Sequence, residues 1–276
     1  KVAVFGAGTM GSGIAQVFAA KGHTALMYAS SVASAQKHKD KLAASLAKRV
    51  AKGKMTQEAV DALLANILVE EKSACADADL IIECVKEDMA TKKELLNELD
   101  GLCKPEAIFA SNTSSLSITE MGNGLKHPVI GMHFFNPVPS MKLVEIIRGA
   151  KTSDATVAAV KAVSAGMGKT AVECKTDTPG FIVNRCLFAF MLEAVHCYEE
   201  GVATVDDIDT AIKLGLNHPM GPFEMMDMSG LDTFPHVCDT LGSLPVTTWS
   251  TPESVKKLVA EGKFGRKSGE GWHKYN

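Results

Sequence analysis

Two residues of this chain place side chains that can move a proton within apolar strand patterns. His133 stands near the end of an apolar strand pattern, and Glu145 lies twelve residues later inside another. A carboxylate within an apolar run is costly to bury unless it has a partner. An imidazole suits it, because a carboxylate that accepts one ring N–H fixes the tautomer and raises the basicity of the other nitrogen. The pair therefore predicts a general base; the alternative is a coincidental structural arrangement.

A glycine pattern at the start of the chain indicates a dinucleotide site. An apolar strand runs directly into Gly6, Gly8 and Gly11, which have the spacing G-x-G-x-x-G, and a helical pattern follows. The first glycine permits a tight turn, the second lets the backbone approach phosphates, and the third lets the helix pack on its strand. The N–H groups of Thr9 and Met10 open the helix, where a pyrophosphate binds. A plain glycine-rich turn is the alternative.

Polar side chains also occur at a predicted strand-to-helix turn and within an apolar helical pattern. Asn112 and Ser114 follow a strand pattern and precede a helical one. They could serve a ligand or form a plain N-cap, where serine and threonine satisfy free N–H groups. Asn184 stands inside the most apolar helical pattern of the chain. A buried amide must be hydrogen-bonded, so its partner is either a neighbouring helix or a substrate.

A basic cluster lies at the end of a helical stretch over residues 32–54. This stretch is longer than a crossover between strands needs, so we expect a helical excursion. The cluster consists of Lys48, Arg49, Lys52 and Lys54. Most charge runs are solvated faces. The alternative is a site for a phosphate-rich substrate such as coenzyme A.

The elements that must position these residues alternate between strand and helix. Such alternation predicts βαβ units, a mainly parallel sheet and ligands at the carboxyl ends of its strands. The expected strands cover residues 2–5, 24–28, 80–85, 107–110, 129–134, 143–147 and 170–174. The alternation stops at Gly180, after which apolar helical patterns dominate. We therefore expect an α/β dinucleotide-binding domain over residues 1–178 and a smaller all-α domain over residues 179–276.

Composition narrows the class of protein. Hydrophobic residues make up 46% of the 276 residues and charged residues 22%, which is ordinary for a globular protein. The net charge of −3 gives no basic field that would attract nucleic acid or a membrane. No apolar run reaches the length of about 18 residues that a membrane span needs. Seven cysteines without C-x-x-C spacing indicate reduced thiols in a cytoplasmic protein, and we expect no metal site.

Taken together, the motifs resemble the 3-hydroxyacyl-CoA dehydrogenase family, and most closely its short, stand-alone bacterial members that act on 3-hydroxybutyryl-CoA. The resemblance runs from Val2 to Tyr275. The resemblance rests on the glycine turn at residues 6–11 and on the segments at residues 110–116, 133–137, 141–145, 178–185, 218–222 and 265–269. It implies a Rossmann-type doubly wound sheet, a nicotinamide cofactor, acetoacetyl-CoA as substrate, a role in butyrate metabolism and a homodimer formed through the helical domain.

The resemblance also implies roles for single residues. His133 is the catalytic base and Glu145 its orienting partner, while Ser114 and Asn184 hydrogen-bond the reacting end of the substrate. The remaining matches are to binding positions. Those toward the nicotinamide are Glu87, Lys92 and Asn112, and those toward the phosphates of coenzyme A are Lys48, Lys52, Lys54 and Arg266.

One position departs from the family pattern. Family members carry an aspartate at the end of the second strand, where it accepts hydrogen bonds from the adenosine ribose, but this chain has Ala29. The anion that would repel a 2′-phosphate is missing, and Ser30 and Ser31 could donate hydrogen bonds to one. The sequence therefore predicts NAD or NADP as cofactor and favours NADP. Backbone groups that hold the NAD ribose are the alternative.

Two other functions fit parts of the pattern. One is a related dehydrogenase of β-hydroxy acids or sugar acids; those enzymes generally use a lysine base, which His133 and the basic cluster argue against. The other is a non-catalytic dinucleotide-binding structural protein, as crystallins related to this family show. The intact set of Ser114, His133, Glu145 and Asn184 disfavours it, and a turnover assay discriminates the two classes.

Overall fold

The chain forms two compact units in the computed structural model, which describes residues 1–242 and 250–275. The first unit is Lys1–Phe181 and the second is Ile182–Asn276. The contacts thus divide the chain at residue 181, where the sequence pattern suggested residue 178. Each unit has its own apolar core.

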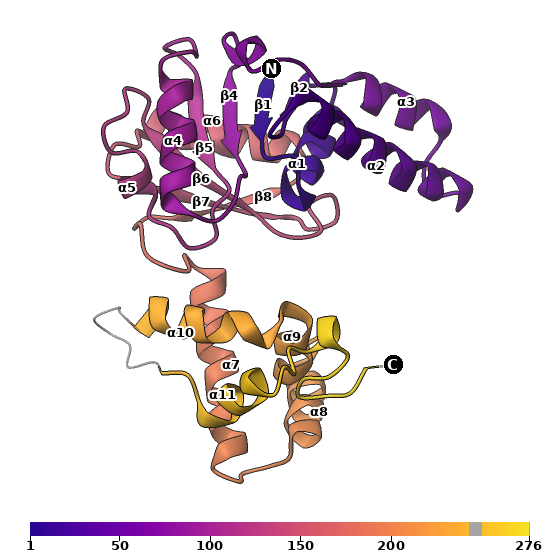
Figure 1. Ribbon diagram of the computed structural model, residues 1–276, viewed down its shortest axis with the longest axis vertical. Helices are drawn as coiled ribbons and strands as arrows, with labels where there is room; N and C mark the ends of the chain where they lie inside the picture. The colour runs from indigo at the N-terminus through magenta and orange to yellow at the C-terminus, as the bar shows by residue number, and fades with distance from the viewer. Residues whose placement is uncertain (243–249, 276) are drawn as a thin grey trace. The chain divides into compact units, whose positions relative to one another are not determined.

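The first unit is built on one mainly parallel sheet (Figure 1). In the described residues its strand order is β3-β2-β1-β4-β5-β6-β7-β8, and only β6 and β7 pair antiparallel. The strands are β1 (Val2–Phe5), β2 (Ala25–Tyr28), β3 (Ile67–Leu68), β4 (Leu80–Glu83), β5 (Ile108–Ser111), β6 (Val129–Phe134), β7 (Leu143–Arg148) and β8 (Thr170–Cys174). The strand order reverses around β1, so the glycine turn after β1 lies at the topological switch point where ligands bind.

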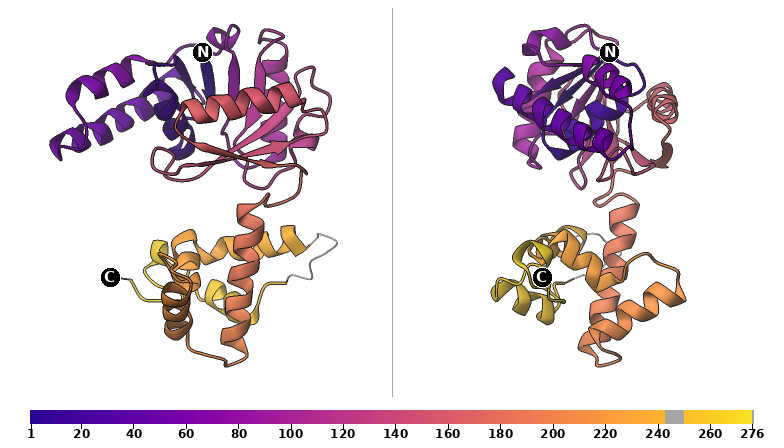
Figure 2. Two further views of the ribbon diagram at one scale, coloured as in Figure 1. Left: turned by 180° about the vertical axis from the view of Figure 1, so that it is seen from behind. Right: turned by 90° about the vertical axis from the view of Figure 1, so that its right-hand side faces the viewer.

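Helices cover both faces of this sheet. They are α1 (Thr9–Ala19), α2 (Val32–Ala51), α3 (Gln57–Ala65), α4 (Met89–Asp100), α5 (Ile118–Met121) and α6 (Asp154–Gly166). α4 and α5 lie on the face seen in Figure 1, whereas α6 lies on the face seen in the left view of Figure 2. α1 and α6 contribute to one core cluster together with β1 and β6. The predicted α/β class of this unit is confirmed.

α2 and α3 form an arm that extends from the sheet, as the excess length of the stretch predicted (Figure 1). Of the residues of α2, only Ala35 and Leu46 are buried. The arm also returns the chain to the sheet as β3, which pairs parallel with β2. The sequence analysis missed β3, because two residues are too few to show a periodic pattern.

The second unit is helical, as predicted. Its helices in the described residues are α7 (Val183–Glu199), α8 (Val205–Gly215), α9 (Pro222–Ser229), α10 (Phe234–Gly242) and α11 (Glu253–Ala260). Phe223 and Val195 are fully buried at the centre of its core. No helix of the described residues has both the length and the apolar character that crossing a membrane requires. All seven cysteines lie in the described residues and are free thiols.

Candidate active site

The predicted proton-transfer pair forms across two neighbouring strands. His133 of β6 and Glu145 of β7 are direct partners in the antiparallel register, and His133 Nδ1 lies 2.7 Å from Glu145 Oε2. Glu145 is fully buried and His133 is 6% exposed. A carboxylate oxygen accepts, so Nδ1 carries the proton and Nε2 keeps its lone pair. The arrangement therefore presents Nε2 as the basic nitrogen.

The surroundings of His133 fix its ring. The ring centroids of Phe135 and Phe181 lie 4.5 Å and 5.7 Å from that of His133. Asn112, which follows β5, accepts a hydrogen bond from the backbone N–H of Phe134 at 2.9 Å. The predicted residue Asn112 therefore holds the end of β6, next to the histidine. A ring held in this way has its basic nitrogen in a defined direction before a ligand arrives.

The glycine turn after β1 has the geometry that a pyrophosphate requires. Gly6 has a φ of +107°, which L side chains rarely adopt. A Cβ built on Gly11 would lie 1.8 Å from the carbonyl oxygen of Gly6, so α1 can start here only with a glycine. At Gly8 the result is the opposite, because none of the described atoms lies within 4 Å of a Cβ built there. The open space at Gly8 fits a phosphate that approaches the N-terminus of α1.

A cavity of about 500 Å³ opens beside this turn. Its lining joins the start of α1 (Gly8 and Thr9), one side of α2 and the loop after β6. His38 and Lys41 of α2 line the cavity, and so do Asn136 to Pro139 of the loop. The cavity therefore connects the dinucleotide turn with the loop that follows His133.

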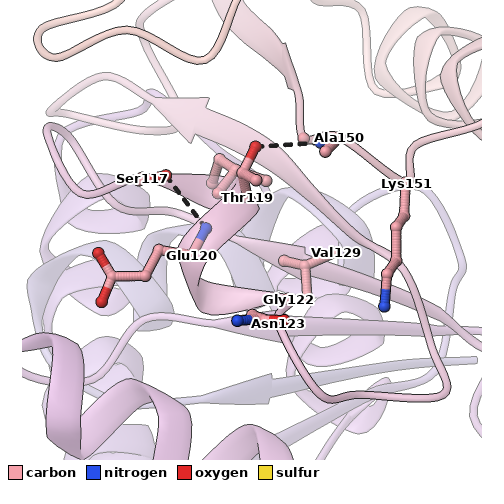
Figure 3. Close-up of a pocket in the computed structure, with 10 residues that line it drawn as sticks. Ser117, Thr119, Glu120, Gly122, Asn123, Val129, Ala150 and Lys151 are labelled. Atoms are coloured by element: carbon pink, nitrogen blue, oxygen red, sulfur yellow. Dashed lines mark hydrogen bonds between the residues drawn. The ribbon is translucent and has the colours of Figure 1, made fainter.

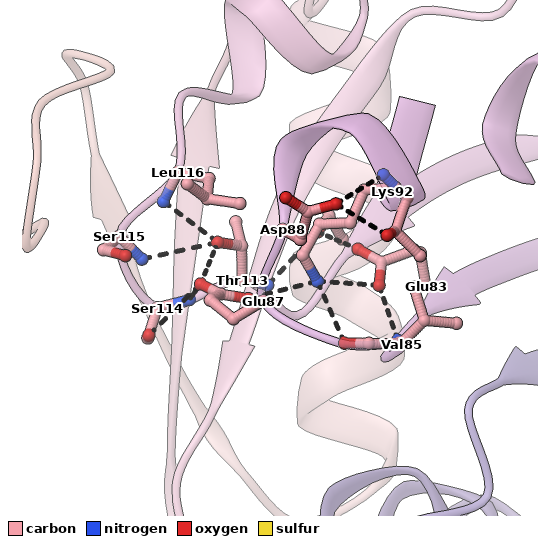
Figure 4. A network of polar contacts seen from close by, with 11 residues as sticks. Glu83, Val85, Glu87, Asp88, Lys92, Thr113, Ser114, Ser115 and Leu116 are labelled. Atoms are coloured by element: carbon pink, nitrogen blue, oxygen red, sulfur yellow. Dashed lines mark hydrogen bonds and ion pairs between the residues drawn. The ribbon is translucent and has the colours of Figure 1, made fainter. Parts of the chain in front are cut away.

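A buried ionic network lies after β4 (Figure 4). Lys92 of α4 is 1% exposed, and its Nζ lies 2.7 Å from Glu83 Oε1 and 3.1 Å from Glu87 Oε2. Glu83 is fully buried and also accepts a hydrogen bond from Ser111 Oγ at 2.6 Å. Burial raises the pKa of Glu83, and the charge of Lys92 opposes this rise.

The same network reaches the predicted substrate residue Ser114 (Figure 4). Glu87 Oε1 accepts from Thr113 Oγ1 at 2.5 Å, from Ser114 N at 2.9 Å and from Ser114 Oγ at 3.3 Å. Burial alone would raise the pKa of Glu87, but the charge of Lys92 and these hydrogen bonds outweigh it and leave the pKa lowered. The structure thus joins three of the predicted residues, Glu87, Lys92 and Ser114, in one cluster.

Glu83 is the charged member of this cluster that the sequence analysis missed. The signal was available, because Glu83 ends an apolar strand in the same way that Glu145 interrupts one. A carboxylate at such a position needs a partner. The partner, Lys92, lies nine residues later on a helix, and nothing in the spacing alone points to it.

The remaining predicted residues lie elsewhere in the two units. Lys48, Lys52 and Lys54 are exposed at the outer end of α2 and beyond it. Asn184 is half-buried in the first turn of α7, in the helical unit. The guanidinium of Arg266, in the same unit, lies 5.2 Å from the ring centroid of Tyr275.

Ser30 and Ser31 lie after β2. The Ser31 hydroxyl accepts a hydrogen bond from Ser34 N at 3.1 Å, so it caps α2. Together with Ala29 these serines line a small cavity of about 100 Å³. The end of β2 therefore provides a second hollow beside the dinucleotide turn.

Another cavity, of about 350 Å³, lies at the start of β6 and contains none of the predicted residues (Figure 3). It is lined by the short helix α5 and by residues around Val129 and Lys151. Asp177 stabilises this helix, because its carboxylate accepts from Ser117 Oγ at 2.6 Å and Thr119 N at 2.7 Å. Val129 begins β6 whereas His133 is near its end, so this cavity lies at the opposite end of that strand from His133.

Comparison with known proteins shows where this arrangement belongs. The family model described as the NAD binding domain of 3-hydroxyacyl-CoA dehydrogenase matches residues 1–178, and the model of the C-terminal domain of the same family matches residues 180–275. The chain belongs to the 3-hydroxyacyl-CoA dehydrogenase family. The resemblance stated from the motifs is thereby confirmed.

This chain is similar to known relatives over at least nine tenths of their length. It is 44% identical to a probable 3-hydroxybutyryl-CoA dehydrogenase of Bacillus subtilis, with 100% of this chain and 97% of the relative covered. It is also 44% identical to human mitochondrial hydroxyacyl-coenzyme A dehydrogenase, with 99% and 90% covered. The crystal structure of (S)-3-hydroxybutyryl-CoA dehydrogenase from Ralstonia eutropha has a TM-score of 0.92 at 40% identity and covers 100% of this chain and 98% of its own.

Proposed function

We propose that this protein interconverts (S)-3-hydroxybutyryl-CoA and acetoacetyl-CoA with a nicotinamide dinucleotide as cofactor, as a step of butyrate metabolism. The His133–Glu145 pair carries the proposal, because its 2.7 Å hydrogen bond leaves Nε2 of a nearly buried imidazole as a base. The names of the Bacillus subtilis and Ralstonia eutropha relatives support this substrate.

In the proposed reaction His133 moves one proton at Nε2. In oxidation Nε2 takes the proton of the 3-hydroxyl, and the carboxylate of Glu145 stabilises the imidazolium that forms. In reduction the imidazolium returns the proton to the 3-oxygen. A bound nicotinamide ring supplies the other half of the chemistry, because it exchanges a hydride with C3 of the substrate.

The proposed substrate contacts complete this step. Ser114 Oγ donates to Glu87 at only 3.3 Å, and we propose that it turns its hydroxyl proton to the 3-oxygen of the substrate, whose own proton faces Nε2 of His133. Asn184 is proposed to hold the same end of the substrate from the helical unit. Glu87, Lys92 and Asn112 are proposed to border the nicotinamide, while the turn at residues 6–11 holds the pyrophosphate.

An initial-rate assay tests the proposal. Acetoacetyl-CoA is supplied with NADH or with NADPH, and loss of the reduced cofactor is followed over a range of each concentration. We expect saturable oxidation with at least one cofactor. No turnover with either one, combined with retained dinucleotide binding, would favour a non-catalytic binding protein.

The basic cluster is proposed to hold the phosphates of coenzyme A, together with Arg266. The double variant Lys52→Gln/Lys54→Gln removes two exposed charges, each worth up to about 1 kcal/mol, so we expect KM for acetoacetyl-CoA to rise roughly tenfold at low salt. We expect kcat to stay constant, and the salt dependence of KM to weaken because fewer charges are screened. Lys151→Gln is the matched control, since Lys151 is also exposed but borders the cavity around α5. Equal KM values for all three proteins would contradict this assignment.

We further propose a cytoplasmic homodimer that associates through the helical unit. The free thiols support a reducing compartment. Val202, Leu214 and Leu216 in the helical unit are 68%, 80% and 59% exposed, and exposed apolar side chains of this kind mark association surfaces when they are contiguous. Sedimentation velocity should give the mass of a dimer, and Leu214→Glu should lower it toward that of a monomer. A wild-type protein that sediments only as a monomer would contradict the proposal.

A further inference from the structure

The carboxyl end of β2 is where a dinucleotide-binding sheet contacts the adenosine ribose, normally through an acidic residue on that strand. Here that position is Ala29. The cavity of about 100 Å³ at this end is lined by Ala29, Ser30 and Ser31, and on its other side by Glu70 and Glu71. Two carboxylates that are distant in sequence therefore border the place where the aspartate is missing.

The pairing of β2 with β3 explains how the carboxylates reach this place. Ala25 is the register partner of Ile67 and Leu26 that of Leu68, so the two strands run parallel. The offset between partners is 42 residues, and continuing it places Glu70 level with Tyr28 at the end of β2. Residues that follow two neighbouring parallel strands at the same register position lie at the same end of the sheet. Glu70 is thus presented to the cavity by a neighbouring strand.

Tyr28, the last residue of β2, is a buried polar residue at the same end of the strand. Tyr28 also lines the cavity, is 6% exposed and has a hydroxyl without a hydrogen-bond partner among the described residues. Burial raises the pKa of Tyr28, and the nearby acidic groups of Cys75 and Glu70 raise it further. Buried polar groups without a partner are the exception in folded proteins, and this one lies near the acidic side chain of Glu70.

Lys72 also lines the cavity and Lys39 lies on α2, but the ammonium groups of both have other partners. Lys39 Nζ donates to the carbonyl oxygen of Ile67 at 2.5 Å, and Lys72 Nζ forms an ion pair with Glu98 at 2.6 Å. The N-terminus of α2 also borders the cavity, but its partial charge of about +0.5 is smaller than two full negative charges. A 2′-phosphate placed here would meet a net negative environment.

We propose that Glu70, with Glu71 beside it, accepts the hydrogen bonds of the adenosine ribose and excludes a 2′-phosphate, so that NAD(H) is the preferred cofactor. The proposal rests on the dinucleotide site of the proposed function. Glu70 and Glu71, which follow the neighbouring strand β3, thus take the role of the missing aspartate. The lean toward NADP that Ala29 suggests remains a prediction from the sequence, and these carboxylates favour the opposite preference.

The first test compares ligands rather than rates. Calorimetry measures the binding of ADP-ribose and of 2′-phospho-ADP-ribose to the wild type and to Glu70→Gln, Glu71→Gln and the double variant. We expect the wild type to bind ADP-ribose at least tenfold more tightly than its 2′-phosphate, and the double variant to narrow this ratio at least tenfold, with Glu70 giving the larger share. Equal ratios in the wild type and double variant, or an effect confined to Glu71, would overturn the assignment.

The second test uses turnover. The ratio of kcat/KM for NADPH to that for NADH should rise at least tenfold in the double variant, while Glu106→Gln, a matched change of an exposed glutamate outside this cavity, leaves it unchanged. A wild type that prefers NADPH would also overturn the proposal. Because calorimetry needs no turnover, failure of the dehydrogenase activity and failure of the Glu70 assignment give different results.

Discussion

Replacing His133 by alanine should lower kcat for acetoacetyl-CoA reduction by about 10² to 10⁴-fold, the range that a positioned general acid or base contributes. The variant lacks the proton donor at the 3-oxygen, whereas the glycine turn that holds the cofactor is unchanged. We therefore expect the dissociation constant of the cofactor to change little. Stopped-flow measurement of a single turnover gives the rate, and calorimetry gives the cofactor affinity.

Glu145→Gln separates orientation from proton transfer. The amide retains a hydrogen bond to the ring but removes the negative charge that stabilises the imidazolium, so its loss in kcat should be smaller than that of His133→Ala. Thermal unfolding of both variants checks that they fold. A His133→Ala protein with a near-normal rate would refute the base assignment, whatever the behaviour of Glu145→Gln.

Alanine substitutions at two glycines of the turn should have separate effects, one on protein stability and the other on cofactor affinity. Gly11→Ala places a Cβ 1.8 Å from the carbonyl oxygen of Gly6, and we expect it to destabilise the protein by about 3 kcal/mol. Gly8→Ala meets none of the described atoms within 4 Å, so its cost in stability should stay below about 1 kcal/mol. Its methyl group occupies the space proposed for the pyrophosphate, and dinucleotide affinity should fall at least about tenfold.

Urea unfolding without ligand measures the first effect and calorimetric titration with NAD measures the second. Each variant is the control for the other, because the same change from glycine to alanine is made three residues apart. Gly8→Ala with wild-type dinucleotide affinity would mean that the phosphates do not approach this turn. Gly11→Ala with wild-type stability would mean that the helix and the turn are not closely packed.

The sequence was most informative where function depends on local pattern. A strand followed by three spaced glycines predicts the turn and the start of α1, and the apolar runs around His133 and Glu145 predict β6 and β7. The two residues become direct partners because β6 and β7 pair antiparallel, and the prediction of a mainly parallel sheet did not say which strands, if any, would do so. The hypothesis of a pair was therefore chemical, and the pairing of the strands supplied its geometry.

Residues that act through long-range pairing could not be predicted. Glu70 and Glu71 reach the end of β2 only because the two-residue strand β3 brings them there, and so short a strand has no periodic signal. The resemblance named Lys92 as a residue near the cofactor, but the sequence did not show that this lysine is buried against Glu83. In both cases a contact between distant segments decides the charge of the site.

The pair of Glu83 and Lys92 also limits how this protein can change over evolutionary time. Both side chains are buried, at 0% and 1% exposure, so losing Lys92 leaves the charge of Glu83 unpaired away from water, and losing Glu83 leaves Lys92 with Glu87 alone. Breaking a buried pair in this way costs about 3 to 5 kcal/mol, and a whole domain is stable by only about 5 to 15 kcal/mol. Descendants that replace one partner first are thus close to unfolding, whereas replacing both with apolar residues avoids that loss. The two positions behave as one inherited unit, and mutational paths through this part of the sheet must change them together.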